Sequence, residues 1–408
     1  MSNCIALLGW SLPAIESMSK LGKNFVVVSF ADFTDYAKEN NIPFVDWDFN
    51  EWNETSNALQ LSEKLKPFGV HTAVALFEET VEWAGALNSI YRDDPRVLNR
   101  AMLCRNKGMM KRKAMLGGLR VGMFEEVNST KEIHKFLDRL NEANLQLEGE
   151  EDSWIHLKPL SAMGTVGHKL LRSRSDIEEK VEERDFPCLI ESHLGGQEFS
   201  CEVFVHDGKI QFLNITEYVK LGFSNFVPCS PEMEAKREII RQANQKLVDI
   251  FGIQYGMLHP EWFINENNEV SFGETAMRVP GGHIFELIEK GQGFDAYQAL
   301  ILCSDPNTTQ EELDMHFAPA REDKPKTYAG SLMVYPKPGH ITKLNIPEEL
   351  TEDSYFVEHT LQPPFQATKV PEEREGFGNH YGTIYFKGDD AERMRQLLLH
   401  YENVAFYV

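Results

Sequence analysis

Lys158 stands at a place in the chain that suits the binding of phosphate. It ends a strand-like run, and a loop of small residues and glycines follows it, with Ser161, Met163, Gly164 and Thr165 among them. Backbone N–H groups of such a loop can approach phosphate oxygens closely, and the ammonium group adds a compact positive charge. The pattern is not a Walker A loop, because GxxxxGK[ST] is absent. The alternative is a surface hairpin with a stray lysine.

The segment from Glu191 to Glu198 has features of a nucleoside-binding segment. It follows an apolar run at residues 188–190, and a strand that breaks after an acid exposes backbone N–H and C=O groups that can pair with an adenine edge. The carboxylate seven residues further on could accept two hydrogen bonds from ribose hydroxyls. The alternative is a solvated loop with two ordinary acids.

Two further carboxylates, Glu261 and Glu274, lie thirteen residues apart, each within a strand-like apolar run. Residues 265–269 between the runs predict a turn, so the two acids could face each other across a hairpin. Two carboxylates among aromatic residues are costly to bury unless a cation lies between them. Hard oxygen ligands with open positions for water and phosphate fit Mg²⁺. The alternative is a pair of solvated edge acids.

Two basic residues accompany these motifs. Arg278 follows Glu274 by four residues and precedes a pair of glycines, so it could hold a γ-phosphate or the charge of an acyl phosphate. The alternative for Arg278 is a salt bridge to Glu274. Lys107 lies in a basic helical segment, where it could reach the phosphates or belong to a solvated charged face.

Three other features concern substrates and cofactors. Glu78 and Glu79 end a strand-like run, where ligands bind in open α/β sheets, so they could meet a substrate ammonium. The alternative is a pair of acids at a helix N-terminus, favoured by the helix dipole. His259 fits a core histidine, and no role is assigned to it. The turn Gly9–Leu12 lacks GxGxxG, which argues against a nicotinamide or flavin site.

The elements that must position these residues fall into three regions. Strands and helices alternate over the first hundred residues, which implies a parallel sheet with helices on its faces. The middle region predicts an antiparallel sheet with helices, so its class is α+β. The tail is rich in β formers and turns and is expected to form a small domain packed on the second. The expected boundaries are 1–98 for the α/β domain, 99–325 for the central domain and 326–408 for the β-rich domain.

Periodicity also predicts individual elements. Buried strands are expected at Cys4–Leu8, Phe25–Phe30 and Thr72–Phe77, and a hairpin turn at Asp207-Gly208. Apolar spacing predicts one helix over Arg100–Met115, one over Ser129–Glu142 and one over Pro231–Phe251. The polar segment Asn141–Asp152 predicts a loop, and Val404–Val408 predicts a last strand.

The composition fits a folded cytoplasmic protein of two or three domains, since 408 residues exceed one compact core. The net charge of −22, from 63 acidic and 41 basic residues, argues against a nucleic-acid backbone as the main partner. We expect no signal peptide and no membrane helix, because the apolar runs are too short. The six cysteines are scattered with no CxxC pair, which favours reduced thiols.

Taken in order, these motifs resemble the ATP-grasp superfamily. Asn106-Lys107, followed by Met110-Lys111 and Gly117-Gly118, looks like the family's "DK…K…G" helix. Lys158 with its loop looks like the family's phosphate lysine and flexible lid. The lid subdomain would then lie at about 120–190. The motifs span about residues 106–282, and the flanking regions fit the family's three-part layout. The resemblance therefore implies an ATP-grasp fold, with a doubly wound α/β domain before it and a small β-rich domain after it.

The resemblance also implies roles for individual residues. Lys107 and Lys158 would bind the phosphates of ATP, and Arg278 would stabilise the acyl-phosphate transition state. Glu261 and Glu274 would hold Mg²⁺, for which Mn²⁺ is an alternative. The other nucleotide-binding residues would be Ser161, Met163, Gly164, Thr165, Glu191, Ser192, Leu194 and Glu198, with the backbone of residues 192–194 at the adenine and Glu198 at the ribose.

Within the superfamily, the long tail and the segment 274–282 look most like the L-amino-acid ligases, which make dipeptides. The implied reaction activates a carboxylate with ATP as an acyl phosphate and couples it to an amine, releasing ADP and phosphate. Two departures concern the substrates. Ala276 stands where many relatives have Asn, and Glu217–Pro228 lacks their "K…GH" pattern, with Tyr218, Lys220 and Asn225 in its place.

Other activities would use the same activation. A carboxylase would depend on bicarbonate, and a ligase that loads an amino acid onto a carrier thiol would depend on the carrier protein. A regulatory module that binds ATP without turnover is the non-enzymatic alternative, and intact Lys158, Glu261, Glu274 and Arg278 argue against it. The expected partners are small-molecule substrates, an amino acid or other carboxylic acid plus an amine, with no nucleic acid and no membrane. The relatives suggest a homodimer.

Overall fold

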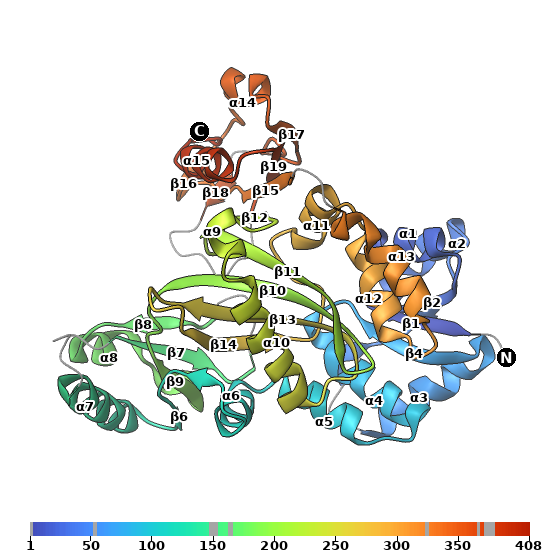
Figure 1. The fold of residues 1–408 in the computed structure, drawn as a ribbon, viewed down its shortest axis with the longest axis horizontal. Coiled ribbons are helices and arrows are strands. Elements are labelled where there is room, and N and C mark those ends of the chain that lie inside the picture. Colours follow the sequence, from blue (N-terminus) through green and yellow to red (C-terminus); the bar gives the residue numbers. More distant parts are fainter. Residues whose placement is uncertain are drawn as a thin grey trace.

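A large sheet crosses the middle of the molecule and connects its other parts (Figure 1). The computed structural model describes residues 3–51, 55–146, 154–161, 166–322, 326–364, 368–370 and 380–408. Within these residues the strands form four sheets, of 4, 9, 2 and 4 strands. The candidate residues come mainly from the nine-stranded sheet and from one of the four-stranded sheets, so these two sheets position the site.

The N-terminal sheet is parallel and has the order β3-β2-β1-β4. Its strands are β1 (Cys4–Leu8), β2 (Asn24–Ser29), β3 (Phe44–Asp46) and β4 (Val70–Ala75). Residues 26–28 of β2 are fully buried, because helices cover both faces of a parallel sheet. Helix α1 (Leu12–Leu21) begins after the N-cap Ser11 and ends at Gly22, whose φ of 69° suits glycine. The α/β class expected for this region is confirmed.

Helices from late in the chain also cover this sheet. α12 (Ala296–Ser304) and α13 (Gln310–Arg321) lie beside β1 and β4 in Figure 1. Apolar side chains of α12 share one hydrophobic cluster with Ile5, Leu7 and Val74 of the sheet. The N-terminal region is therefore packed against the middle region through apolar burial, which contributes roughly 25 cal/mol per Å² of apolar area.

The central sheet has the order β17-β19-β15-β12-β11-β10-β13-β14-β5 and is largely antiparallel. Its strands are β5 (Arg120–Val121), β10 (Gln197–His206), β11 (Lys209–Lys220), β12 (Ser224–Val227), β13 (Tyr255–Ile264), β14 (Val270–Ala276), β15 (Tyr328–Met333), β17 (Phe356–His359) and β19 (Thr383–Gly388). Side chains alternate between the faces of a strand. One face carries Phe199, Cys201 and Trp262 and packs on α10 (Arg237–Phe251). The opposite face carries Glu198, Glu261 and their neighbours and forms the floor of the site.

A smaller antiparallel sheet, β6-β9-β7-β8, holds the remaining candidates. Its strands are β6 (Phe124–Val127), β7 (Ile155–Pro159), β8 (Lys169–Leu171) and β9 (Cys188–Ser192), with helices α7 (Thr130–Gln146) and α8 (Arg174–Lys180). Ile155, Leu157 and Ile190 face those helices. By alternation Lys158 and Glu191 lie on the other face.

The tail differs in one respect from the expected packed domain. β15 pairs with β12, and β19 and β17 follow, so the tail's main strands extend the central sheet. The tail still has its own hydrophobic cluster beneath α15 (Ala391–Glu402), and a separate pair of strands, β16 (Gly339–Ile341) and β18 (Thr368–Val370). Unpaired edge groups of β12 explain the extension, since strand pairing satisfies them.

Four predicted elements have different limits. The helix expected over Arg100–Met115 is two helices, α5 (Arg96–Leu103) and α6 (Lys107–Leu116), because Asn106 is extended and its side chain caps α6. The helix expected over Pro231–Phe251 is likewise divided into α9 (Pro231–Glu234) and α10. α7 continues to Gln146, into the predicted loop Asn141–Asp152, whose end lies outside the described residues. Val404–Val408 forms no regular strand; its pairing with residues 342–345 amounts to the isolated bridge Leu344↔Tyr407 and the backbone hydrogen bonds around it.

The other helices complete the cover of the sheets. They are α2 (Thr34–Glu39), α3 (Thr55–Leu65), α4 (Val81–Arg92), α11 (Ile284–Gln292) and α14 (Glu348–Glu352). No helix within the described ranges is long and apolar enough to cross a membrane. All six cysteines are described, and each is buried with a free thiol, as the lack of paired spacing predicts.

Candidate active site

Glu261 and Glu274 lie directly opposite each other on β13 and β14, as predicted. A bulge makes this possible, because the register shifts between Glu261 and Trp262 and leaves Gly273 as the extra residue. Without the bulge, Glu274 would share the face of Phe272, which packs in the apolar core. A Cβ at Gly273 would lie 2.9 Å from the carbonyl oxygen of Glu261, so the close approach requires glycine.

The electrostatics of this pair fit a cation-binding role. Burial, together with the charges of Glu274 and Glu198, raises the pKa of Glu261 to about 7. Burial acts in the same direction on Glu274, but the ammonium groups of Lys107 and Lys158 lower its pKa to about 2. A divalent cation between the two carboxylates would relieve their mutual repulsion.

Lys107 reaches this pair from the start of α6. Its Nζ lies 2.9 Å from Oε2 of Glu274, and its backbone N–H donates to the carbonyl of Leu160 over 3.0 Å. Leu160 lies two residues after Lys158, just beyond the end of β7, so Lys107 connects the proposed metal ligand Glu274 with the start of the loop predicted to bind phosphate. The structure therefore brings Lys107 into the candidate site, not onto a solvated face.

Lys158 is joined to a second lysine through Glu191. Nζ of Lys158 lies 2.6 Å from Oε1 of Glu191, and Nζ of Lys111 lies 2.5 Å from Oε2. Lys111 also donates to the bulge carbonyl of Gly273 over 2.8 Å. Burial would raise the pKa of Glu191, but the two lysines hold it well below its usual range. The Glu191 side chain therefore holds lysines in place, a role that the sequence-based interpretation as an adenine hinge did not include.

Lys111 is a further functional candidate. It is part of the lysine motif in the sequence, but no role was predicted for it there. Its side chain is only 1% exposed, which is rare for lysine. It lies four residues after Lys107, so both side chains leave α6 on one face. That spacing was the available signal, although a basic helix more often indicates a solvated surface.

The predicted adenine hinge lies at the edge of the smaller sheet. Two of its backbone N–H groups are already used, since Ser192 donates to Met123 over 2.8 Å and His193 donates to Trp154 over 3.0 Å. The N–H of Leu194 has no acceptor among the described residues. Leu194 is thus the hinge residue whose amide can donate to a ligand.

The other predicted nucleotide contacts surround this edge. Glu198 lies at the start of β10, where burial and the charges of Glu274 and Glu191 raise its pKa to about 7. Ser161 is exposed at the end of the described part of the loop. Met163, Gly164 and Thr165 lie outside the described residues.

Three histidines line the same edge and were not singled out from the sequence. Nδ1 of His156 lies 2.8 Å from Nε2 of His168, and Nε2 of His156 lies 2.9 Å from Nδ1 of His193. The ring centroids are 5.0 and 5.3 Å apart, so the rings meet edge to edge in a nearly flat row. Burial lowers the pKa of His156 to about 3 and that of His168 to about 4, which keeps both rings neutral.

Arg278 is held by an acid from the N-terminal region. Its Nε donates to Oε2 of Glu78 over 2.8 Å, while Nη1 of Arg105 donates to Oε1 over 2.6 Å. Burial would raise the pKa of Glu78, but the two guanidinium groups lower it. The alternative of a salt bridge from Arg278 to Glu274 is wrong, because the partner is Glu78. Both oxygens of Glu78 are engaged, so a substrate ammonium at Glu78 is no longer expected; Glu79 is exposed.

The departures at residues 217–228 have structural explanations. Asn225 donates to the carbonyl of Gly282 over 3.1 Å, and Ser331 donates to the same oxygen over 3.0 Å. These contacts hold the glycine loop that follows Arg278. Lys220 pairs with Glu402 of α15, so it belongs to the contact with the tail.

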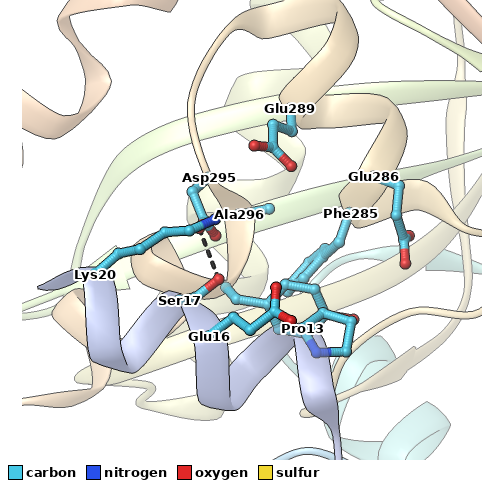
Figure 2. A pocket seen from close by; sticks show the side chains of 10 residues that line it. Pro13, Glu16, Ser17, Lys20, Phe285, Glu286, Glu289, Asp295 and Ala296 are labelled. Atoms are coloured by element: carbon cyan, nitrogen blue, oxygen red, sulfur yellow. Dashed lines mark hydrogen bonds between the residues drawn. The ribbon is translucent and has the colours of Figure 1, made fainter.

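A small cavity lies apart from this cluster. Its volume is about 80 Å³, and α1 and the α11–α12 region line it (Figure 2). Ser17 donates to Oδ2 of Asp295 over 2.6 Å at its wall, and Glu286 and Glu289 lie across from α1 (Figure 2). None of the predicted site residues lines this cavity.

The residues present fit ATP and Mg²⁺. Glu261 and Glu274 offer oxygen ligands, and Lys107, Lys111 and Lys158, which pair with Glu274 and Glu191, offer positive charge for phosphates. Among the described residues no group of three or more Asp, Glu, His or Cys side chains is placed to bind a metal. Mg²⁺ would therefore rest on two carboxylates and on oxygens of phosphate and water, which is how Mg²⁺ usually binds.

Comparisons with known proteins agree with this geometry. The family model of the ATP-grasp domain matches residues 161–285. An L-arginine-specific L-amino acid ligase from Bacillus subtilis is 23% identical over 262 residues, which are 59% of this chain and 60% of that relative's length. The match therefore leaves part of the relative uncovered.

Solved structures share the whole architecture. An L-amino acid ligase from Bacillus licheniformis superposes with a TM-score of 0.72 at 16% identity, covering 100% of this chain and 98% of that one. A phosphoribosylglycinamide synthetase from Anaerococcus prevotii gives 0.67 at 14% identity, covering 100% and 99%. An N5-carboxyaminoimidazole ribonucleotide synthetase from Thermotoga maritima gives 0.66 at 14% identity, also covering 100% and 99%. The resemblance predicted from the motifs is confirmed: the ATP-grasp domain model matches residues 161–285, and the chain is similar in sequence and fold to L-amino acid ligases.

Proposed function

We propose that this protein is an ATP-dependent carboxylate–amine ligase that joins an amino acid, or another small carboxylic acid, to an amino acid. One observation carries the proposal. Three lysines pair with Glu274 and Glu191 at 2.5 to 2.9 Å beside the carboxylate pair, and Arg278 follows Glu274 by four residues. Such a set can hold a triphosphate and stabilise charge on a transferring phosphoryl group.

The reaction would take two steps. An oxygen of the substrate carboxylate attacks the γ-phosphorus of ATP, ADP leaves, and an acyl phosphate forms. The amine of the second substrate then attacks the acyl carbon, phosphate leaves, and the nitrogen loses a proton. Mg²⁺, held by Glu261 and Glu274, would neutralise phosphate charge.

The chain's own residues would support each step. Lys107 and Lys158 bind the phosphates, while Glu191 and Lys111 keep Lys158 in place. Arg278, fixed by Glu78, stabilises the negative charge at the acyl group. The amide of Leu194 and the carboxylate of Glu198 bind the adenosine, as the motif order suggests.

Amino acids are the substrates to test first, because the two Bacillus relatives are described as an L-arginine-specific L-amino acid ligase and an L-amino acid ligase. Release of ADP and phosphate is measured with Mg·ATP across all amino acids, singly and in pairs, with mass spectrometry of the products. A pair-dependent product with the summed mass less one water would support the proposal. ADP release that depends on bicarbonate or a carrier protein would replace the proposed reaction with a carboxylase or a carrier ligase.

A further inference from the structure

A buried acid and a histidine lie side by side on the floor of the site, next to the carboxylate pair. Nδ1 of His259 lies 3.0 Å from Oε1 of Glu202, which is fully buried. His259 precedes Glu261 by two residues on β13, so the two side chains share one face of the strand. Neither residue has a part in the reaction proposed above.

Glu202 is fixed by hydrogen bonds from three other side chains. Oε2 accepts from Nδ2 of Asn214 over 2.6 Å and from Oγ1 of Thr216 over 2.7 Å. Oε1 accepts from Oγ of Ser200 over 3.3 Å. Gln292 of α11 in turn donates to Oδ1 of Asn214 over 3.0 Å. The donors converge on the carboxylate, which is how a buried charge is kept stable.

This network determines how the imidazole of His259 is presented. A carboxylate accepts hydrogen bonds only, so Nδ1 of His259 donates to Glu202, and in the neutral imidazole the lone pair is then on Nε2. Nε2 has no hydrogen-bond partner among the described residues, and the side chain keeps 8% exposure. A histidine that served packing alone would normally have both nitrogens satisfied.

His259 lies near the residues proposed to bind the metal and near the strand that leads to Arg278. It stands opposite Ala276 on β14, next to the register pair Glu261–Glu274. Arg278 follows Ala276 by two residues at the end of the same strand. Along the paired strands β13 and β14, His259 is therefore displaced from the proposed metal ligands in the direction of Arg278, the residue proposed to stabilise the acyl group.

We propose that Nε2 of His259 accepts a hydrogen bond from the nitrogen of the amine substrate, and that Glu202 positions His259 for this contact. This inference rests on the proposed ligase function and assigns a residue to the second substrate. A neutral amine needs its N–H groups directed away from the acyl carbon and its lone pair toward it. An acceptor on the sheet floor supplies that orientation.

The test separates activation of the acid from attack by the amine. Hydroxylamine at high concentration traps acyl phosphates as hydroxamates without needing a positioned amine. In His259→Leu, we expect coupling to the amine substrate to fall by about 100-fold, while hydroxamate formation stays within about 2-fold of wild type. The Michaelis constant for ATP should stay unchanged.

A second variant keeps every atom of His259. In Glu202→Gln the amide nitrogen can donate to Nδ1, which would place the hydrogen on Nε2 and remove the acceptor. We expect the same selective loss of coupling. His206→Leu is the matched control, because His206, on β10, is also buried, but its Nδ1 donates to the carbonyl of Cys303 and to no carboxylate. Both reactions should stay near wild type in this control.

The outcomes distinguish this inference from the function on which it rests. If both reactions fall together in His259→Leu and Glu202→Gln, the pair serves ATP or metal binding and the inference is wrong. If neither falls, His259 is a core histidine and the inference is also wrong. If wild-type protein forms neither hydroxamate nor amide with any acid, the proposed function fails and this inference fails with it.

Discussion

Arg278 and Glu78 form an ion pair of 2.8 Å although 200 residues separate them in the chain. Glu78 follows strand β4 of the N-terminal sheet, and Arg278 follows β14 of the central sheet. Arg105, which lies between α5 and α6, binds the other oxygen of Glu78. Two guanidinium groups on one carboxylate leave a net positive charge, which suits an anionic acyl group.

Glu78→Gln should therefore impair catalysis without weakening ATP binding. Loss of the charge releases Arg278 from its fixed geometry, and we expect kcat to fall by about 10- to 100-fold. Steady-state kinetics with the substrate pair measure this, with the KM for ATP expected within about 2-fold. Glu79→Gln is the control, because Glu79 is the exposed neighbour. Equal effects of the two substitutions would contradict a role of the Glu78–Arg278 ion pair in catalysis.

Lys111→Met should weaken ATP binding and destabilise the fold. It leaves Glu191 buried with one lysine in place of two, which costs about 3–5 kcal/mol when a buried pair is broken. We expect the KM for ATP to rise by at least about 10-fold as Lys158 loses its fixed partner. Lys113→Met on the exposed side of α6 is the matched control. Wild-type ATP kinetics in Lys111→Met would show that this lysine is only structural.

Glu274→Gln should abolish ADP release and leave the fold intact. The substitution removes one of the two proposed metal ligands, and we expect the rate to fall by about 1,000-fold or more. Lys158→Ala should raise the KM for ATP or abolish turnover, because it removes a positive charge proposed to bind the phosphates. Glu269→Gln, at the exposed turn of the same hairpin, should be near wild type. Full activity in Glu274→Gln would contradict the assignment of Glu274 as a metal ligand.

Asp305 predicts a pH dependence of stability. It is buried at the end of α12, where His71 at 2.8 Å and Lys23 at 3.2 Å connect it to the N-terminal region. Burial would raise its pKa, but the hydrogen bonds from His71 and the Asn307 backbone, with the charge of Lys23, lower the pKa to about 2. An unfolded Asp titrates near about 3.9, so this carboxylate stabilises the fold above that pH and loses its effect as the pH falls toward 2.

Denaturant unfolding of wild type and Asp305→Asn measures this. At pH 7 we expect a loss on the order of 2 kcal/mol in the free energy of unfolding. The difference should shrink steadily between about pH 4 and pH 2. Asp314→Asn, an exposed ion-pair residue on α13, is the control and should change stability little. A difference for Asp305→Asn that is constant with pH would contradict the assignment.

How much of the site could be predicted depends on how local each relationship is. The pairing of Glu261 with Glu274 followed from two apolar runs around a turn, and the register confirms it. The bulge at Gly273 that aims Glu274 at the site could not be predicted, because one extra residue changes the face without changing the composition. Strand periodicity likewise located β1, β2 and β4 to within about two residues, whereas the short strand β3 was not predicted.

The missed relationships depend on tertiary packing. Glu78 and Arg278 meet only because two sheets pack together, and no periodicity encodes a contact across 200 residues. Lys111 is buried because Glu191 arrives from another sheet, whereas a basic helix by itself predicts a solvated face. The division of the helix at Asn106 does have a local signal, because asparagine is a favoured N-cap residue.

Activation of a carboxylate as an acyl phosphate is the step on which the proposed function depends. Its most direct test uses the substrate pair identified by the amino-acid screen, with ¹⁸O in the carboxylate of the acid. Attack of the carboxylate on the γ-phosphorus predicts ADP as the nucleotide product and one ¹⁸O atom in each phosphate released. Unlabelled phosphate, or AMP and pyrophosphate in place of ADP and phosphate, would contradict the account.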